Sequence, residues 1–248
     1  MIVNRDERRG RANSFASVAD AYERGRPEYP LDAVRWLTGD APADVVDLGA
    51  GTGKLTRGIV ALGHRVIAVE PLPEMLEHLS RAAPEARALT GSAEAIPLPD
   101  ASADVVACAQ AFHWFDHAAA LPEIVRVLRP RGRLALVWNT RDDREPWVAQ
   151  LSDTIVGRET IRESDALGPV GTSGLFDVVE TTTFSFRQRL DRASLRDLVL
   201  SRSYCAVLPP DEREDVLARV DGLYDAQAGP HGLDMPYVTE CFRAQRLE

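Results

Sequence analysis

The stretch DVVDLGAGTGK, residues 44–54, restricts the possible folds of this chain more than any other. It begins as a short apolar run, and residues 55–63 after it have helical spacing. Between them, glycines occupy alternate positions at Gly49, Gly51 and Gly53. A glycine turn that leads from a buried strand into a helix is typical of α/β folds in which a ligand approaches the main chain.

The alternation of strand and helix extends over the first 140 residues. Apolar runs predict strands over 44–49, 65–71, 103–110 and 133–139, and a third strand followed by a loop over 86–100. Helical spacing predicts helices over 31–40, 55–63, 74–83 and 118–132, and a short helix with a rigid turn over 15–30. Strands that alternate with helices indicate βαβ units, and strands that are apolar throughout indicate helices on both faces.

The pattern changes after residue 140. Residues 178–190 and 235–246 read as strands, and residues 194–204 and 211–227 as helices. We therefore predict a doubly wound, Rossmann-like α/β fold with a mostly parallel seven-stranded sheet, an antiparallel last strand and a helical cap in the C-terminal half. We expect a single domain over 1–248, with a ligand-binding core at 15–140, cap elements and an outer strand at 141–235, and the final strand at 236–248.

Composition limits the possible partners. A formal net charge of −9 argues against a nucleic acid partner. Lys54 is the only lysine and lies beside the glycine turn, so a Schiff-base mechanism is disfavoured. The three scattered cysteines indicate reduced thiols in a cytoplasm, and no apolar run predicts a signal peptide or a membrane span.

The glycine spacing separates three ligand classes. A nucleotide triphosphate loop would need glycine at Leu48 and serine or threonine at Leu55. A dinucleotide motif would need glycine at Lys54. The spacing D-x-G-x-G-x-G favours a ligand without a diphosphate, whose carboxylate lies at the helix start and whose ammonium group lies near Asp47.

Three further elements follow at strand ends. Glu70 comes 23 residues after Asp47 and can accept hydrogen bonds from both ribose hydroxyls, which suits NAD equally well. Ser92 and Glu94 could bond an adenine amino group, with Ala93 and Ile96 against the ring. The segment AQAFHWFD, 109–116, places four more side chains at the carboxyl edge of the sheet: Gln110, Phe112, His113 and Trp114.

Together, DLGAGTG, AVEP, SAEAIPLPD and AQAFHWFD resemble the class I S-adenosylmethionine-dependent methyltransferases. The segments AYERGRPEYP and AQAFHWFD further resemble the small-molecule branch that includes trans-aconitate methyltransferase-like proteins. The resemblance covers residues 15–140 strongly and the remainder weakly. It implies S-adenosylmethionine as cofactor and a small organic molecule as methyl acceptor, with no membrane partner and no prediction of oligomeric state.

The resemblance also implies roles for particular residues. The expected cofactor contacts are Asp47, Gly49, Ala50, Gly51, Thr52, Gly53, Glu70, Pro71, Met75, Ser92, Ala93, Glu94, Gln110 and Ala111, with Tyr22 and Arg26 from a lid segment. The expected substrate contacts are Tyr29, Trp114, Arg141 and Tyr204. Ser92 departs from the aspartate that many relatives carry, which weakens the adenine contact assigned to it.

Methyl transfer from a sulfonium is an in-line displacement that needs alignment and exclusion of water. If the acceptor is a hydroxyl, His113 is the expected general base, although it could instead fix its loop. If the acceptor is a carboxylate, no base is needed, and Arg26, Arg141 and Arg202 are candidates to hold it.

Two alternatives remain at this point. The chain could be a non-catalytic protein that binds the same cofactor. It could also be an NAD-dependent oxidoreductase, although the glycine spacing and the lack of a Tyr-x-x-x-Lys pair argue against that class. The identity of the acceptor atom, whether oxygen, nitrogen, sulfur or carbon, is not predicted.

Overall fold

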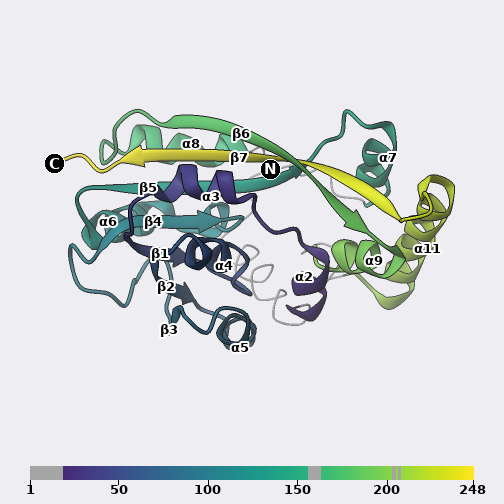
Figure 1. Cartoon of the computed structure of the whole chain (residues 1–248), viewed down its shortest axis with the longest axis horizontal. Coiled ribbons are helices and arrows are strands. Elements are labelled where there is room, and N and C mark those ends of the chain that lie inside the picture. Colours follow the sequence, from purple (N-terminus) through teal and green to yellow (C-terminus); the bar gives the residue numbers. More distant parts are fainter. Residues whose placement is uncertain (1–18, 156–162, 203–204, 206–207) are drawn as a thin grey trace. The chain divides into compact units, whose positions relative to one another are not determined.

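A computed structural model describes residues 19–155, 163–202, 205 and 208–248. Its sheet has seven strands in the order β3-β2-β1-β4-β5-β7-β6, as Figure 1 shows. The strands are β1 Asp44–Leu48, β2 Arg65–Glu70, β3 Arg87–Thr90, β4 Ala103–Ala109, β5 Leu128–Arg141, β6 Glu180–Leu190 and β7 Leu233–Gln245. Strands β1 to β5 pair in parallel, and β7 runs in the opposite direction, which confirms the predicted fold class.

The helices alternate with the first five strands as expected. The described helices are α2 Ala19–Gly25, α3 Leu31–Thr38, α4 Lys54–Ala61, α5 Pro73–Ala82, the 3-10 turn η2 Phe112–Trp114, α6 His117–Val127, α7 Pro146–Thr154, α8 Glu163–Thr172, α9 Arg192–Leu200 and α11 Pro210–Gln227. The sequence did not predict α7 and α8, because the apolar spacing between residues 141 and 177 is weak and Pro169 lies inside α8.

The chain divides into two compact units. Unit 1 comprises Met1–Pro27, Thr140–Thr160 and Ser185–Val238, and unit 2 comprises Glu28–Asn139, Ile161–Phe184 and Thr239–Glu248. The boundary falls within three strands, β5, β6 and β7. The expected subdivision at residues 140 and 235 stays a prediction.

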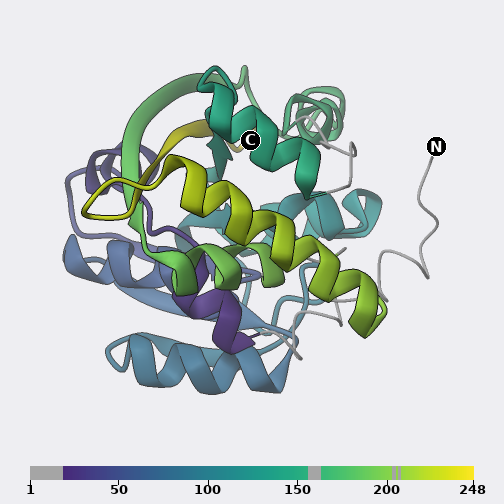
Figure 2. The ribbon, with the colours of Figure 1, turned by 90° about the vertical axis from the view of Figure 1, so that its right-hand side faces the viewer.

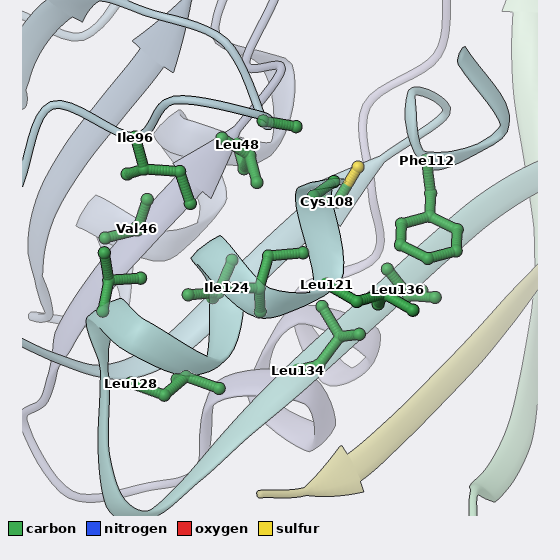
Figure 3. Packing of buried hydrophobic residues seen from close by; sticks show 14 of the residues in the cluster. Val46, Leu48, Ile96, Cys108, Phe112, Leu121, Ile124, Leu128, Leu134 and Leu136 are labelled. Carbon is green, nitrogen blue, oxygen red and sulfur yellow. The ribbon is translucent and has the colours of Figure 1, made fainter. Parts of the chain in front are cut away.

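Unit 2 has a core on each face of its part of the sheet. Val105 and Ala107 of β4 face α3 and α4, whereas Val106 and Cys108 face α6. This alternation follows from the period of two along a strand. Figure 3 shows the second core, in which Cys108 lies among apolar side chains from β1, β5 and α6. Burial on both faces explains why these strands are apolar throughout.

Unit 1 has a separate core. Buried side chains from α7, α9, α11 and β7 meet in it, among them Leu151, Leu198, Val220 and Tyr237. Helix α9 lies beside both α2 and α11, which Figure 2 shows. The close approach of α2 to α9 depends on Gly25, because a Cβ atom there would lie 2.2 Å from the backbone nitrogen of Leu198.

The boundary between α6 and β5 differs from the prediction. We expected a helix over 118–132 and a strand from residue 133, but α6 ends at Val127 and β5 begins at Leu128. Leu128 pairs with Ala103 at the start of β4, and the register then shifts before Val105. Residues 128–132 therefore pair with β4 as a strand although their local pattern favours a helix. Strand pairing is a tertiary effect, and the periodicity of the sequence does not predict it.

Two observations complete the fold. Cys108, Cys205 and Cys241 are buried and form no disulfide. Among the described residues, no helix has both the length and the apolar character needed to cross a membrane.

Candidate functional site

The candidate site lies at the carboxyl edge of the parallel strands in unit 2. Strands β1 and β4 are neighbours, and the chain proceeds from them toward opposite sides of the sheet. Such a reversal of strand order leaves a crevice between the two loops that follow, which is where open α/β sheets bind ligands. The glycine turn follows β1, and residues 110–114 follow β4, so the predicted motifs meet at this point.

The three glycines of the turn have different reasons to be glycine. Gly49, Gly51 and Gly53 all have positive φ angles, of +70°, +56° and +89°. A Cβ at Gly49 would lie 2.8 Å from the Cβ of Ala111, and one at Gly53 would lie 3.1 Å from Leu79. At Gly51 a Cβ would meet no described atom within 4 Å. Gly51 therefore exposes bare main chain, as a closely approaching ligand requires.

Asp47, at the end of β1, is fully buried beneath the turn. The Thr56 hydroxyl on α4 donates to its Oδ2 at 2.5 Å, whereas Oδ1 has no hydrogen-bond partner among the described residues. The pKa of the Asp47 carboxyl is raised to about 7, mainly by burial and to a smaller extent by the nearby Glu70 charge, while the hydrogen bonds from Thr56 act to lower it. The buried Thr52 hydroxyl likewise lacks a described partner.

Glu70 closes the turn from the end of β2. Its Oε2 accepts from the backbone N–H of Gly51 at 2.9 Å, and its Oε1 accepts from that of Leu72 at 3.1 Å. Burial raises the pKa of the Glu70 carboxyl, and the two N–H donors act in the opposite direction. Each carboxylate oxygen can accept a further hydrogen bond, so both remain chemically able to receive ribose hydroxyls.

The loop after β3 is held mainly by its own contacts with α6. Glu94 accepts a hydrogen bond from the backbone N–H of Asp116 at 2.9 Å, which joins this loop to the start of α6. Ala93 and Met75 are buried in the core, Ser92 is half-buried, and Pro71 is exposed. Of the residues expected around the adenine, Ser92 and Glu94 are the polar ones, and both are half-buried in the loop that follows β3.

Gln110 follows β4 with a φ angle of +56°, which is costly for a residue other than glycine. Its amide donates to the backbone oxygen of Asn139 at 3.0 Å. Strain of this kind concentrates at functional sites, where surrounding contacts stabilise it. The sequence placed Gln110 at this edge, but nothing in the sequence indicated its unusual backbone conformation.

Asn139 is a residue that sequence reasoning missed. It lies buried near the end of β5, accepts from the Thr239 hydroxyl at 2.7 Å and donates to the backbone oxygen of Glu28 at 3.1 Å. The Glu28 carboxylate in turn pairs with Lys54 at 3.2 Å and Arg57 at 2.6 Å on the first turns of α4. The available signal was a polar residue that ends an otherwise apolar strand.

The two histidines after β4 have different surroundings. His113 is half-buried, with its ring centroid 4.6 Å from that of Trp114. His117 stacks on Phe112 at 4.6 Å, and its Nε2 donates to the Phe112 carbonyl at 3.0 Å. His117 therefore fixes the loop, and the role of His113, as general base or as a further loop contact, stays a prediction. Tyr29 packs against the unit 2 core.

The remaining expected contacts belong to unit 1 or lie outside the described residues. Arg26 donates to the Ser201 hydroxyl at 2.8 Å and lies 5.2 Å from the ring centre of Tyr22. Arg141 donates to the Ser152 hydroxyl at 3.2 Å. Tyr204 lies outside the described residues.

The glycine turn and its acids fit the cofactor that the sequence suggested. Gly51 leaves open space over the main chain, and Asp47 offers an unpartnered acceptor for a cationic group. The Glu70 carboxylate accepts a hydrogen bond from the Gly51 N–H of the same turn. The fold and this edge define a class of α/β proteins that bind their ligand at the carboxyl ends of parallel strands.

Comparison with known proteins identifies the family. The family described as "Methyltransferase domain" matches residues 46–136. An uncharacterized methyltransferase of Mycobacterium tuberculosis is 49% identical over 242 residues, which cover 96% of this chain and 97% of the relative. An uncharacterized methyltransferase-like protein of Schizosaccharomyces pombe is 42% identical over 238 residues, 91% of this chain and 90% of that protein.

A solved structure from Anaeromyxobacter dehalogenans, provisionally assigned to the type II methyltransferases, has a TM-score of 0.68 at 28% identity. It covers 89% of this chain, and the match spans 97% of that chain. The chain belongs to the class I S-adenosylmethionine-dependent methyltransferases. The alternative of an NAD-dependent oxidoreductase is thereby set aside, and the resemblance to the trans-aconitate branch stays a prediction.

Proposed function

We propose that this enzyme transfers a methyl group from S-adenosylmethionine to a small organic acceptor by in-line displacement. The observation that carries the proposal is the open main chain at Gly51 beside the unpartnered Oδ1 of Asp47. A ligand with an ammonium group and a carboxylate suits this arrangement, because the buried acid attracts the cation and the first turn of α4 attracts the anion.

Each cofactor contact follows from a group at the edge. Asp47 and the Thr52 hydroxyl would hold the amino-acid part, and Glu70 would accept the ribose hydroxyls. Ser92 and Glu94 would border the adenine, with Gln110 beside the sulfonium. The expected lid contacts of Tyr22 and Arg26 remain part of the proposal.

The acceptor is proposed to be small. A net charge of −9 opposes binding to the phosphates of nucleic acids. The bound cofactor supplies a methyl carbon that is already activated for transfer. The chain would align the acceptor in line with that carbon and exclude water. His113 and Trp114 flank the exit of β4, and His113 would accept a proton from a hydroxyl acceptor.

The test is incorporation of label. The purified protein is incubated with methyl-labelled S-adenosylmethionine and a fractionated cell extract, and labelled products are identified by mass. We expect one labelled small molecule with wild-type protein and none with Gly51→Val, whose side chain would fill the space over the turn. Absence of cofactor binding by calorimetry, or label only in macromolecules, would refute the proposal.

A further inference from the structure

The loop over 91–100, which follows β3 in unit 2, contains two prolines close together. Pro97 and Pro99 have no backbone N–H, and each restricts the residue before it to extended backbone. A segment of this kind cannot form the regular hydrogen bonds of a helix or of an interior strand. The remaining polar groups of its backbone therefore need partners from elsewhere in the fold.

Arg126 on α6 supplies several of these partners. Its Nη2 donates to the Ile96 carbonyl at 2.9 Å, and its Nη1 donates to the Leu98 carbonyl at 2.7 Å. These two carbonyls are the ones that directly precede the prolines. Nη1 also donates to the Asp100 carboxylate at 2.9 Å. One guanidinium group thus holds the loop at three points.

Glu123 fixes Arg126 from the preceding turn of α6. The Arg126 Nε donates to Glu123 Oε1 at 2.7 Å and Nη2 donates to Oε2 at 2.8 Å, which is the parallel, bidentate geometry. The same Oε2 accepts from the backbone N–H of Ile96 at 3.0 Å. The hydrogen bonds from Arg126 hold the pKa of the Glu123 carboxyl below its usual value, so the pair is charged at neutral pH.

This arrangement uses every donor of the Arg126 side chain. A guanidinium group has five N–H donors in a rigid fork, and here Nε bonds one oxygen while each Nη atom bonds two. A lysine has three donors on a single atom and cannot reproduce the fork. The pair therefore depends on arginine in particular, unlike an ordinary ion pair on the surface.

The other end of the loop also lies against α6. Glu94 accepts from the backbone N–H of Asp116, the residue that precedes α6, at 2.9 Å. Ala93 and Ile96 are buried in the core, where Figure 3 shows Ile96 among apolar side chains. Contacts with α6 thus fix the loop both near its start and near its end.

From these contacts we infer, on the basis of the proposed function, that Arg126 and Glu123 are positioning residues for adenine recognition. The proposed function assigns Ser92, Ala93 and Glu94 to the adenine, and all three belong to the loop that Arg126 holds. A loop that has its bound shape before the ligand arrives loses little freedom on binding, so the affinity is higher. Arg126 and Glu123 act through the loop and touch no cofactor atom themselves.

The first test measures affinity and adenine preference together. Calorimetry compares S-adenosylhomocysteine with S-inosylhomocysteine, in which a carbonyl oxygen replaces the adenine amino group. We expect wild-type protein to prefer the adenosyl ligand. Arg126→Lys should weaken binding of that ligand about tenfold, because the loop must then become ordered on binding, and it should narrow the preference. A general loss of stability would not change the ratio of the two affinities.

Arg129→Lys is the matched control. The Arg129 side chain is 37% exposed, close to the 30% of Arg126. It pairs with Asp44 at 2.9 Å and with Asp104 at 2.8 Å, at the starts of β1 and β4. This variant removes a comparable ion-pair geometry away from the loop, so it should keep the wild-type affinity and preference. Equal losses in the two variants would overturn the inference.

The second test measures the loop itself without cofactor. Hydrogen exchange at the Ile96 amide should be faster in Arg126→Lys than in the wild type, and unchanged in Arg129→Lys. Glu123→Gln is a milder second variant, in case Arg126→Lys does not fold, and should also speed this exchange and narrow the preference. Unchanged exchange at Ile96, or wild-type affinity and preference in the folded variants, would overturn the inference.

The two tests separate this inference from the proposed function. If wild-type protein binds neither S-adenosylmethionine nor S-adenosylhomocysteine, the proposed function fails, and adenine recognition fails with it. The hold of Arg126 on the loop is then still measured by exchange at Ile96. If the wild type binds both ligands and Arg126→Lys binds them equally well, the proposed function stands and only the positioning role is refuted.

Discussion

Gly51→Ala is the most direct test of the cofactor site, and Gly63→Ala is its matched control. Gly51 has a φ angle of +56° and Gly63 one of +84°. A Cβ at either position would meet no described atom within 4 Å. The two substitutions therefore impose backbone strain without steric overlap, but only Gly51 lies in the turn after β1. Gly63 lies between α4 and β2.

The expected cost to stability is small and similar for both variants. Left-handed backbone costs an alanine about 1–2 kcal/mol, and the reduced freedom of the unfolded chain returns roughly 0.4–1 kcal/mol. A net loss of about 1 kcal/mol should lower the melting temperature by roughly 2–4 °C in a chain of this size. Thermal unfolding followed by circular dichroism measures both variants under the same conditions.

Cofactor affinity should separate the two variants. A methyl group inserted between ligand and main chain is expected to cost about 1–3 kcal/mol, as overpacking does elsewhere. This corresponds to a loss of roughly 5- to 150-fold in the affinity for S-adenosylmethionine. Gly63→Ala should bind as the wild type does in isothermal titration calorimetry. Equal affinities in Gly51→Ala and Gly63→Ala would refute the assignment of the open space to the cofactor.

Three further predictions follow from the structure. The pKa of Asp47 is about 7, and a bound cationic group favours the ionised carboxylate, so the affinity for the cofactor measured by calorimetry should be about tenfold weaker at pH 6 than at pH 8. Asp47→Asn should remove this pH dependence. A wild-type affinity that does not change with pH would count against a role for Asp47 in binding the cation. Gly25→Ala should lower the free energy of unfolding by roughly 2–3 kcal/mol in urea titration, because its Cβ would lie 2.2 Å from the Leu198 nitrogen; an unchanged midpoint would disprove that packing. Gln110→Gly and Arg131→Gly each relieve a positive φ angle, but only the first should reduce turnover, and equal turnover would argue against a role for the Gln110 side chain.

Much of the cofactor edge could be predicted from the sequence. The strand before Gly49, the helix after Gly53 and the strand that ends in Glu70 all have local signals, because periodicity and glycine spacing depend on neighbouring residues. Parallel strands then bring their carboxyl ends to one edge whatever the remaining contacts are. The roles of individual side chains were less accessible. His117 fixes the loop after β4, and this depends on its contact with Phe112.

The sequence by itself thus determined the α/β class and the succession of the first five strands along the chain, because these depend on short-range pattern. The ligand edge at Gly51 is a prediction from the same pattern. Only the tertiary structure decided the start of β5 at Leu128, which pairing with β4 sets. It also decided the raised pKa of Asp47, since burial is a property of the folded core. The binding of the Ile96 and Leu98 carbonyls by Arg126 is likewise tertiary, because the loop and α6 are separate segments of the chain.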